Sequence, residues 1–83
     1  MHDIHVANKV YKLVVENAKS NGIDVVKKIE IDLGSIVEHG ADITAENLDF
    51  NLKMLGETTF DKKIEIKINR VEGNDWKLVS ISG

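Results

Sequence analysis

The chain has 83 residues, 42% of them hydrophobic and 30% charged, which fits one globular domain rather than a disordered or fibrous protein. Eleven basic residues against 14 acidic ones give a net charge of -3 without an extended basic run, which argues against nucleic-acid binding. The absence of cysteine excludes disulfides, thiolate nucleophiles, iron–sulfur clusters and zinc sites built from paired CxxC motifs.

The beginning of the chain shows no targeting or membrane signal. The string MHDIHVANK has no basic region followed by an apolar core. No apolar run approaches the roughly 18 residues needed to cross a bilayer. We therefore expect a cytoplasmic protein that does not bind membranes.

The first predicted element is an amphipathic helix over residues 4–21. Its apolar residues recur at helical spacing and are Val6, Val10, Leu13, Val14 and Ala18. Asp3 is a suitable N-cap, and Asn21 followed by Gly22 is typical of a helix end.

Residues 27–34 predict a strand with one buried face, because apolar and charged residues alternate there. Residues 35–43 are polar and glycine-containing, which indicates a loop. Thr44 can then cap a second helix that ends at Gly56. The alternating residues of the strand are Ile29, Ile31 and Leu33 against Lys28, Glu30 and Asp32, and the buried stripe of the helix is Ala45, Leu48, Leu52 and Leu55.

The last third of the chain predicts two more strands. Ile64, Ile66 and Ile68 alternate with polar residues, and a further β-prone segment covers residues 76–81. The run 72–75, Glu-Gly-Asn-Asp, favours a tight turn, so we expect a closing hairpin. The expected fold is α+β, with two helices packed on one face of a small, largely antiparallel three- or four-stranded sheet.

The main chemical signal lies at the N-terminus. His2 and His5, two of the three histidines, lie beside Asp3 and the α-amino group of Met1. If Met1 is retained, as a bulky second residue favours, its amine, the His2 amide nitrogen and the His2 imidazole form adjacent chelate rings. Such a nearly planar nitrogen set suits Ni(II) or Cu(II) better than zinc, magnesium or calcium.

Two alternatives apply to this cluster. Asp3 or His5 can fill a remaining metal position, but an Asp3 that caps the helix already binds backbone amides. Any chain that begins Met-His has the same chelating potential, and a terminal histidine is most often only solvated.

The order of elements resembles the HypA/HybF family of hydrogenase nickel-incorporation metallochaperones. Met1-His2-Asp3 corresponds to the family's Met-His-Glu start. The strings that follow in family order are IEIDLG at residues 29–34, ENLDF at residues 46–50 and KIEI at residues 63–66. The resemblance covers nearly the whole chain.

The resemblance implies that His2 is the essential nickel ligand and that the Met1 amine shares the coordination. Asp3 stands for the usual glutamate and has a shorter reach. Family members insert a zinc-binding domain with two CxxC pairs between the positions of Val71 and Trp76, where this chain has four residues. The resemblance therefore predicts residues 1–83 as a single HypA-like nickel-binding domain without a zinc domain or zinc site.

The expected function is that of a nickel-binding metallochaperone, with Met1, His2, Asp3 and His5 as metal ligands. Its implied partners are a hydrogenase maturation GTPase or the hydrogenase large subunit, and a homodimer is a further expectation for so small a core. The alternative is a non-metal protein–protein interaction module that uses a sheet edge or a helix face.

Other residues are better explained without a site. His39 is a lone loop histidine, and Glu30, Asp32 and Glu65 fall on the polar phase of strands, which indicates a solvated face rather than a catalytic dyad. Trp76 and Phe50 are expected to pack in the core or at its edge rather than to anchor a partner. A glycine-rich phosphate loop and a nucleophile elbow are both missing, so we do not expect an enzyme.

Overall fold

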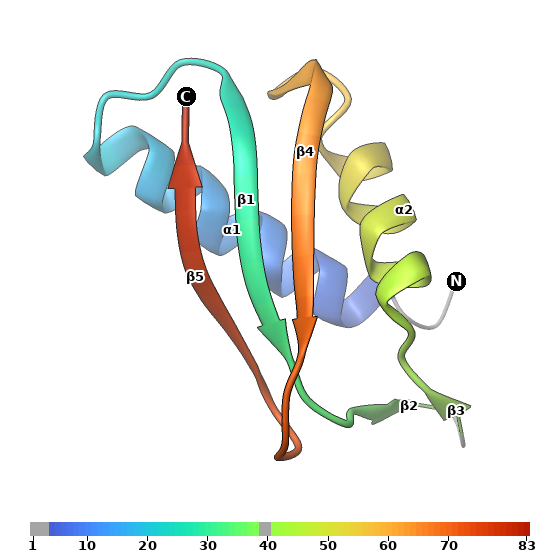
Figure 1. Ribbon diagram of the computed structural model, residues 1–83. Coiled ribbons are helices and arrows are strands. Elements are labelled where there is room, and N and C mark those ends of the chain that lie inside the picture. The colour runs from blue at the N-terminus through green and yellow to red at the C-terminus, as the bar shows by residue number, and fades with distance from the viewer. Residues whose placement is uncertain (1–3, 39–40) are drawn as a thin grey trace.

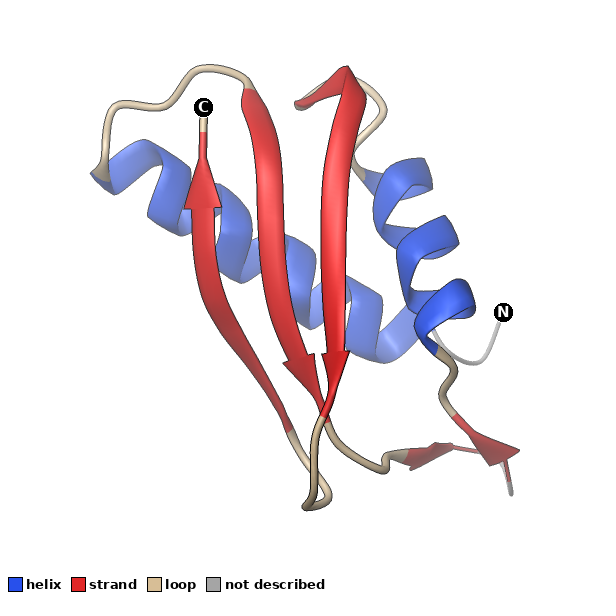
Figure 2. Cartoon of the chain, viewed as in Figure 1, coloured by secondary structure: helices blue, strands red, loops and turns tan. Residues whose placement is uncertain are grey.

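The computed structural model describes the backbone of residues 4–38 and 41–83 and the side chains of residues 6–36 and 43–83. Both helices cover the same face of one sheet, and α1 runs diagonally across the back of it as viewed (Figures 1 and 2). This confirms the predicted α+β fold. The elements are α1 (Ile4–Ser20), β1 (Val26–Leu33), β2 (Val37–Glu38), β3 (Ala41–Asp42), α2 (Ala45–Leu55), β4 (Phe60–Arg70) and β5 (Trp76–Ser82).

The helix ends follow from local sequence signals. At the end of α1 the N–H of Gly22 donates to the Lys19 carbonyl at 3.3 Å, and the N–H of Ile23 donates to the Ala18 carbonyl at 2.8 Å. Gly22 has φ 68, so these contacts form a Schellman motif. At the start of α2, Thr44 Oγ1 accepts from the N–H of Asn47 at 3.1 Å, which confirms the predicted cap.

The sheet is mixed rather than largely antiparallel, and its strand order is β4-β1-β5. Strand β1 pairs parallel with β4 and antiparallel with β5. The connection from β1 to β4 contains α2. A helical crossover of this kind brings the chain back to the starting end of the sheet, so the second strand can run in the same direction as the first. The predicted antiparallel bias was therefore wrong.

The predicted closing hairpin was also wrong, because β1 lies between β4 and β5 (Figure 1). Residues 71–75 carry the chain across the end of β1 instead of folding β5 back onto β4. The N–H of Gly34 donates to the Asp75 carbonyl and the N–H of Ser35 to the Gly73 carbonyl, both at 2.8 Å. We call residues 71–75 the crossing loop.

Gly34 has a steric reason to be glycine. A Cβ atom at this position would lie 2.7 Å from the carbonyl oxygens of both Asp75 and Gly73. These are backbone atoms that are already held by hydrogen bonds to residues 34 and 35. The close approach of the crossing loop to β1 therefore requires a residue without a side chain.

The core lies between the sheet and the helices. Ile29, Ile31 and Leu33 of β1 are fully buried on the inner face, as their alternation predicted. On the outer face the Asn69 amide nitrogen donates to Glu30 Oε2 and to Asp32 Oδ1, each at 3.0 Å. The carboxylates of β1 thus belong to a polar sheet surface, as the sequence indicated.

The segment 35–43, predicted as a loop, contains the short antiparallel strands β2 and β3. Val37 lies opposite Asp42, and Glu38 lies opposite Ala41. Strands of two residues give too little alternation to be recognised in a sequence.

Candidate metal site and its surroundings

The predicted ligands lie at the start of the chain, where the structure describes little. Met1, His2 and Asp3 lie outside the described residues. The backbone of His5 belongs to the first turn of α1, and its side chain is outside the described set. The structure therefore leaves this ligand set, and the predicted Asp3 cap, as predictions.

Helix α1, which follows the predicted ligands Met1, His2 and Asp3, is packed against the core. Val6 is 6% exposed and Ala7 is fully buried, so the first turns of α1 are held by packing. The side of α1 also contacts α2. Ligands placed immediately before Ile4 would thus be attached to a fixed helix end rather than to a long tail.

The electrostatics of this helix end matter for a cation. The N-terminus of a helix has a partial positive charge, and the first turn of α1 contains no acidic residue to offset it. A divalent cation bound there would need an anionic donor for compensation. The Asp3 carboxylate is the nearest such group along the sequence.

The described side chains do not gather into a metal-ligand cluster of their own. Among the residues whose side chains are described, no group of three or more histidine, cysteine, aspartate or glutamate side chains could hold a metal ion. His39 also lies outside this set, so the structure does not test its role.

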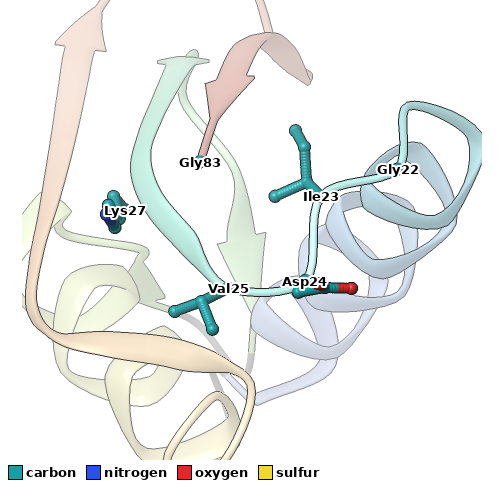
Figure 3. Close-up of a pocket in the computed structure, with 6 residues that line it drawn as sticks. All are labelled: Gly22, Ile23, Asp24, Val25, Lys27 and Gly83. Carbon is teal, nitrogen blue, oxygen red and sulfur yellow. The ribbon is translucent and has the colours of Figure 1, made fainter.

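The hollow beside the C-terminal end of the described chain does not have the features of an active site. This hollow of about 420 Å³ lies between the α1–β1 connection and the C-terminal end of the chain (Figure 3). Asp24 and Lys27 are its charged residues, and Asp24 points away from Lys27 in Figure 3. The hollow thus shows no paired acid and base.

Two apolar side chains are exposed on α2. Phe50 is 65% exposed and Met54 is 49% exposed, and they lie one helical turn apart. The expectation that Phe50 packs in the core was wrong, whereas Trp76 is half-buried against the core as expected. The sequence contained a usable signal, because Phe50 and Met54 fall outside the stripe formed by Leu48, Leu52 and Leu55.

In the described part of the chain, neither helix is long and apolar enough to span a membrane. The molecule is thus a small α+β domain in which two helices cover one face of a mixed three-stranded sheet. The metal ligands predicted at Met1, His2, Asp3 and His5 stay its candidate site.

Comparisons with known proteins find similarity to hydrogenase maturation factors. The chain is 28% identical over 78 residues to the hydrogenase maturation factor HypA of Rhizobium leguminosarum bv. viciae, covering 94% of the chain and 66% of that protein. It is 31% identical over 71 residues to HypA of Methanobrevibacter smithii, covering 86% of the chain and 54% of that protein. No protein-family model matches the chain.

The fold has a close counterpart as well. The solution structure of the Ni metallochaperone HypA from Helicobacter pylori matches with a TM-score of 0.74 at 14% identity, covering 98% of this chain and 96% of that one. The chain is thus similar in sequence to the HypA proteins and shares the fold of one of them. It spans between about half and two thirds of the length of the curated relatives it matches.

Proposed function

We propose that this HypA-like chain binds Ni(II) as a cargo ion during hydrogenase maturation and passes it to a partner protein. The observation that carries the proposal is the string Met1-His2-Asp3 placed directly before α1 in a chain similar to HypA. The relatives carry the names of maturation factors and a metallochaperone, not of enzymes, and a role without catalysis fits them.

The proposed ligands are the Met1 amine, the His2 amide and imidazole nitrogens, and either Asp3 or His5. Nitrogen donors in a planar arrangement favour Ni(II) or Cu(II), and anionic donors offset the charge of the cation. The buried Val6 and Ala7 hold the helix that follows, so the ligands would be positioned by the folded domain.

The acceptor we propose is a hydrogenase maturation GTPase or the hydrogenase large subunit. A cytoplasmic location and the absence of a zinc site within residues 1–83 are parts of the same proposal. The sequence contains no cysteine, so a zinc site of the paired CxxC kind cannot form from these residues.

The proposal predicts stoichiometric Ni(II) binding by the untagged chain. Calorimetric titration should give one saturable site with a Kd of about 1 μM or tighter, which corresponds to about 8 kcal/mol. The d–d absorption bands should indicate square-planar or octahedral coordination. The matched control is the same chain with an N-terminal tag, which removes the free amine and should lose most of the affinity. Weak, unsaturable binding by the untagged chain would refute the proposal.

A second candidate function is a non-metal interaction module on the same scaffold. The exposed pair Phe50 and Met54 favours it, because aromatic and methionine side chains are enriched where proteins bind one another. This pair would form part of a docking face on the side of α2 that points away from the core.

Replacing Phe50 by serine separates this second function from folding. Because Phe50 is 65% exposed, the free energy of unfolding should change by no more than about 0.5 kcal/mol. Binding to a purified maturation GTPase or hydrogenase large subunit should weaken by at least about tenfold. The control is Glu46→Ser on the same helix, and equal effects of both variants would argue against a Phe50 contact.

A further inference from the structure

Helix α2 buries one polar side chain among its leucines. Asn51 is 8% exposed, and no other polar or charged residue in the described part of the chain is buried as deeply. Its side-chain amide makes no hydrogen bond to any residue that the structure describes. A buried amide of this kind is costly, because folding removes its hydrogen bonds to water and supplies none in return. Asn51 therefore calls for a partner.

The position of Asn51 around the helix axis shows which element covers it. The leucines of α2 form a stripe toward the core, and Asn51 lies along one border of this stripe. The opposite border faces β4 across a hollow of about 440 Å³, and its residues are Glu46, Asp49 and Lys53. Helix α2 packs mainly on α1 and β4. Because Asn51 is buried on the side away from β4, α1 is the element that covers it.

Contacts at the end of α2 show which part of α1 this is. The Tyr11 Oη and Thr59 Oγ1 atoms are 2.8 Å apart, and the ring centroids of Tyr11 and Phe60 are 5.7 Å apart. The N–H of Phe60 donates to the Gly56 carbonyl at 2.8 Å, so Tyr11 lies beside the C-terminal end of α2. Asn51, more than one turn before Gly56, thus lies next to a neighbouring part of α1.

This part of α1 is its beginning. Helix α1 also contacts β5, which lies on the far side of β1 from β4 and α2. Figure 1 shows α1 starting beside α2 and running behind the sheet toward β5. The turns that Asn51 faces are therefore those before Tyr11, where Ala7 is fully buried.

The proposed metal ligands belong to the same end of this helix. Helix α1 begins at Ile4, and Met1, His2 and Asp3 directly precede it in the sequence. The segment that carries them thus joins the domain at the helix end that Asn51 faces. An unpaired buried amide and the ligand segment come from distant parts of the sequence but share one region of the fold.

The chemistry of a ligating imidazole supplies the partner that Asn51 lacks. A histidine that binds a metal through one ring nitrogen keeps an N–H on the other, and this N–H needs an acceptor. In the proposed chelate the His2 ring binds through Nδ1, the nitrogen closer to its backbone, which leaves the Nε2–H. The Oδ1 atom of an asparagine is a suitable acceptor. Such outer partners fix the orientation of the ring and strengthen its bond to the metal.

We propose that Asn51 is a positioning residue for the nickel site, and that its Oδ1 atom accepts the Nε2–H of His2 when the chain holds Ni(II). The inference rests on the proposed nickel function and adds a residue of α2 to it. Asn51 acts through His2 and does not touch the metal. Its amide gains in the loaded chain a hydrogen bond that it lacks in the metal-free chain, and this gain favours nickel binding.

The first test is the nickel affinity of Asn51→Leu and Asn51→Ala in the untagged chain. Leucine keeps the branched shape of asparagine without its polar atoms, and alanine removes the amide without adding volume. Calorimetric titration with Ni(II) should show about 10- to 100-fold weaker binding by both variants, the usual effect of losing an outer partner of a ligating histidine.

The second readout is the stability of the metal-free chain. Asn51→Leu removes an unpaired buried amide, so the melting temperature should rise by at least about 4 °C. A residue with a purely structural role would behave differently, because its loss would lower the stability as well as the affinity. Weaker nickel binding by a more stable chain is therefore the result that identifies a positioning residue.

Two further variants serve as rescue and control. Asn51→Asp keeps an oxygen acceptor at the same reach, so it should bind Ni(II) within about threefold of the natural affinity, although its buried carboxylate destabilises the metal-free fold. Asn8→Leu changes an exposed asparagine near the start of α1. It should leave the nickel affinity unchanged.

The outcomes separate this inference from the proposed function. A natural chain without a saturable Ni(II) site would refute both together. Saturable binding by the natural chain and equal affinity of Asn51→Leu would overturn the role of Asn51 alone. If Asn51→Leu and Asn51→Ala both melted at lower temperatures than the natural chain, Asn51 would already have a partner in the metal-free fold, and the inference would be overturned too.

Discussion

Replacing His2 by alanine is expected to abolish saturable Ni(II) binding while leaving the circular dichroism spectrum unchanged. The change removes the imidazole and breaks the chelate ring that joins it to the backbone amide. The affinity should fall by at least about 100-fold, which corresponds to about 2.7 kcal/mol. Folding should be unaffected, because the described core begins at Val6 and does not include residue 2. Calorimetry and circular dichroism on the same samples measure both effects.

Three further variants test which other side chains bind the metal. His5→Ala and Asp3→Ala should each weaken binding less than His2→Ala, because only one of the two side chains is needed to complete the site. His39→Ala should have no effect, since a lone loop histidine is not part of the proposed ligand set. If the His2 variant kept stoichiometric binding, the N-terminal site would be wrong. A large effect of His39→Ala would instead point to a site shared with that loop.

The helices and the buried strand could be predicted from the sequence because their signals are local. Helix α1 was predicted over 4–21 and covers Ile4–Ser20. Asn21 and Gly22 indicate where it ends. The alternation around Ile29 and Ile31 also fixed which side of β1 is buried. These patterns depend on residues a few positions apart, so one sequence is enough to read them.

The strand order could not be predicted in the same way. Residues 72–75 have turn-forming composition whether they close a hairpin or cross a neighbouring strand, so composition alone favoured the simpler hairpin. In the structure the loop crosses β1 next to Gly34, whose contacts with Gly73 and Asp75 join residues at least 39 positions apart in sequence. In the sequence, the only local sign of these long-range contacts is a single glycine.

For the candidate site, the sequence predicted which residue types could bind a metal but not how they are arranged. The residue types at positions 1–5 suggest a nitrogen-rich metal site, but their arrangement lies outside the described residues. The opposite holds for the exposed surface of α2. The residue type of Phe50 suggested burial, whereas its position outside the leucine stripe indicated exposure. An aromatic residue in a small protein suggests core packing, but its position around the helix axis decides whether it can reach the core.

The crossing loop also has a bearing on the relation to longer relatives. The resemblance predicts that longer relatives carry a zinc-binding domain between the positions of Val71 and Trp76, and this stays a prediction. Here those positions are the ends of a segment that bonds directly to residues 34 and 35. The segment therefore stabilises the end of β1 in addition to joining two strands.

Replacing Gly34 by alanine is expected to destabilise the fold by about 2–3 kcal/mol. The new Cβ would lie 2.7 Å from two backbone carbonyl oxygens, so the crossing loop would have to move away from β1. The move would lengthen the two 2.8 Å hydrogen bonds from residues 34 and 35, each contributing about 0.5–1.5 kcal/mol. For a domain of this size the melting temperature should fall by about 10–20 °C.

Ser35→Ala is the matched control for this effect. The Ser35 side chain is exposed, and the variant keeps the backbone N–H that donates to Gly73. Its stability should lie within about 0.5 kcal/mol of the natural chain in chemical denaturation. If Gly34→Ala were equally mild, the crossing loop would have room to adjust, and the steric argument for glycine at this position would be wrong. A large difference between the neighbours would show that this backbone contact contributes to the stability of the fold.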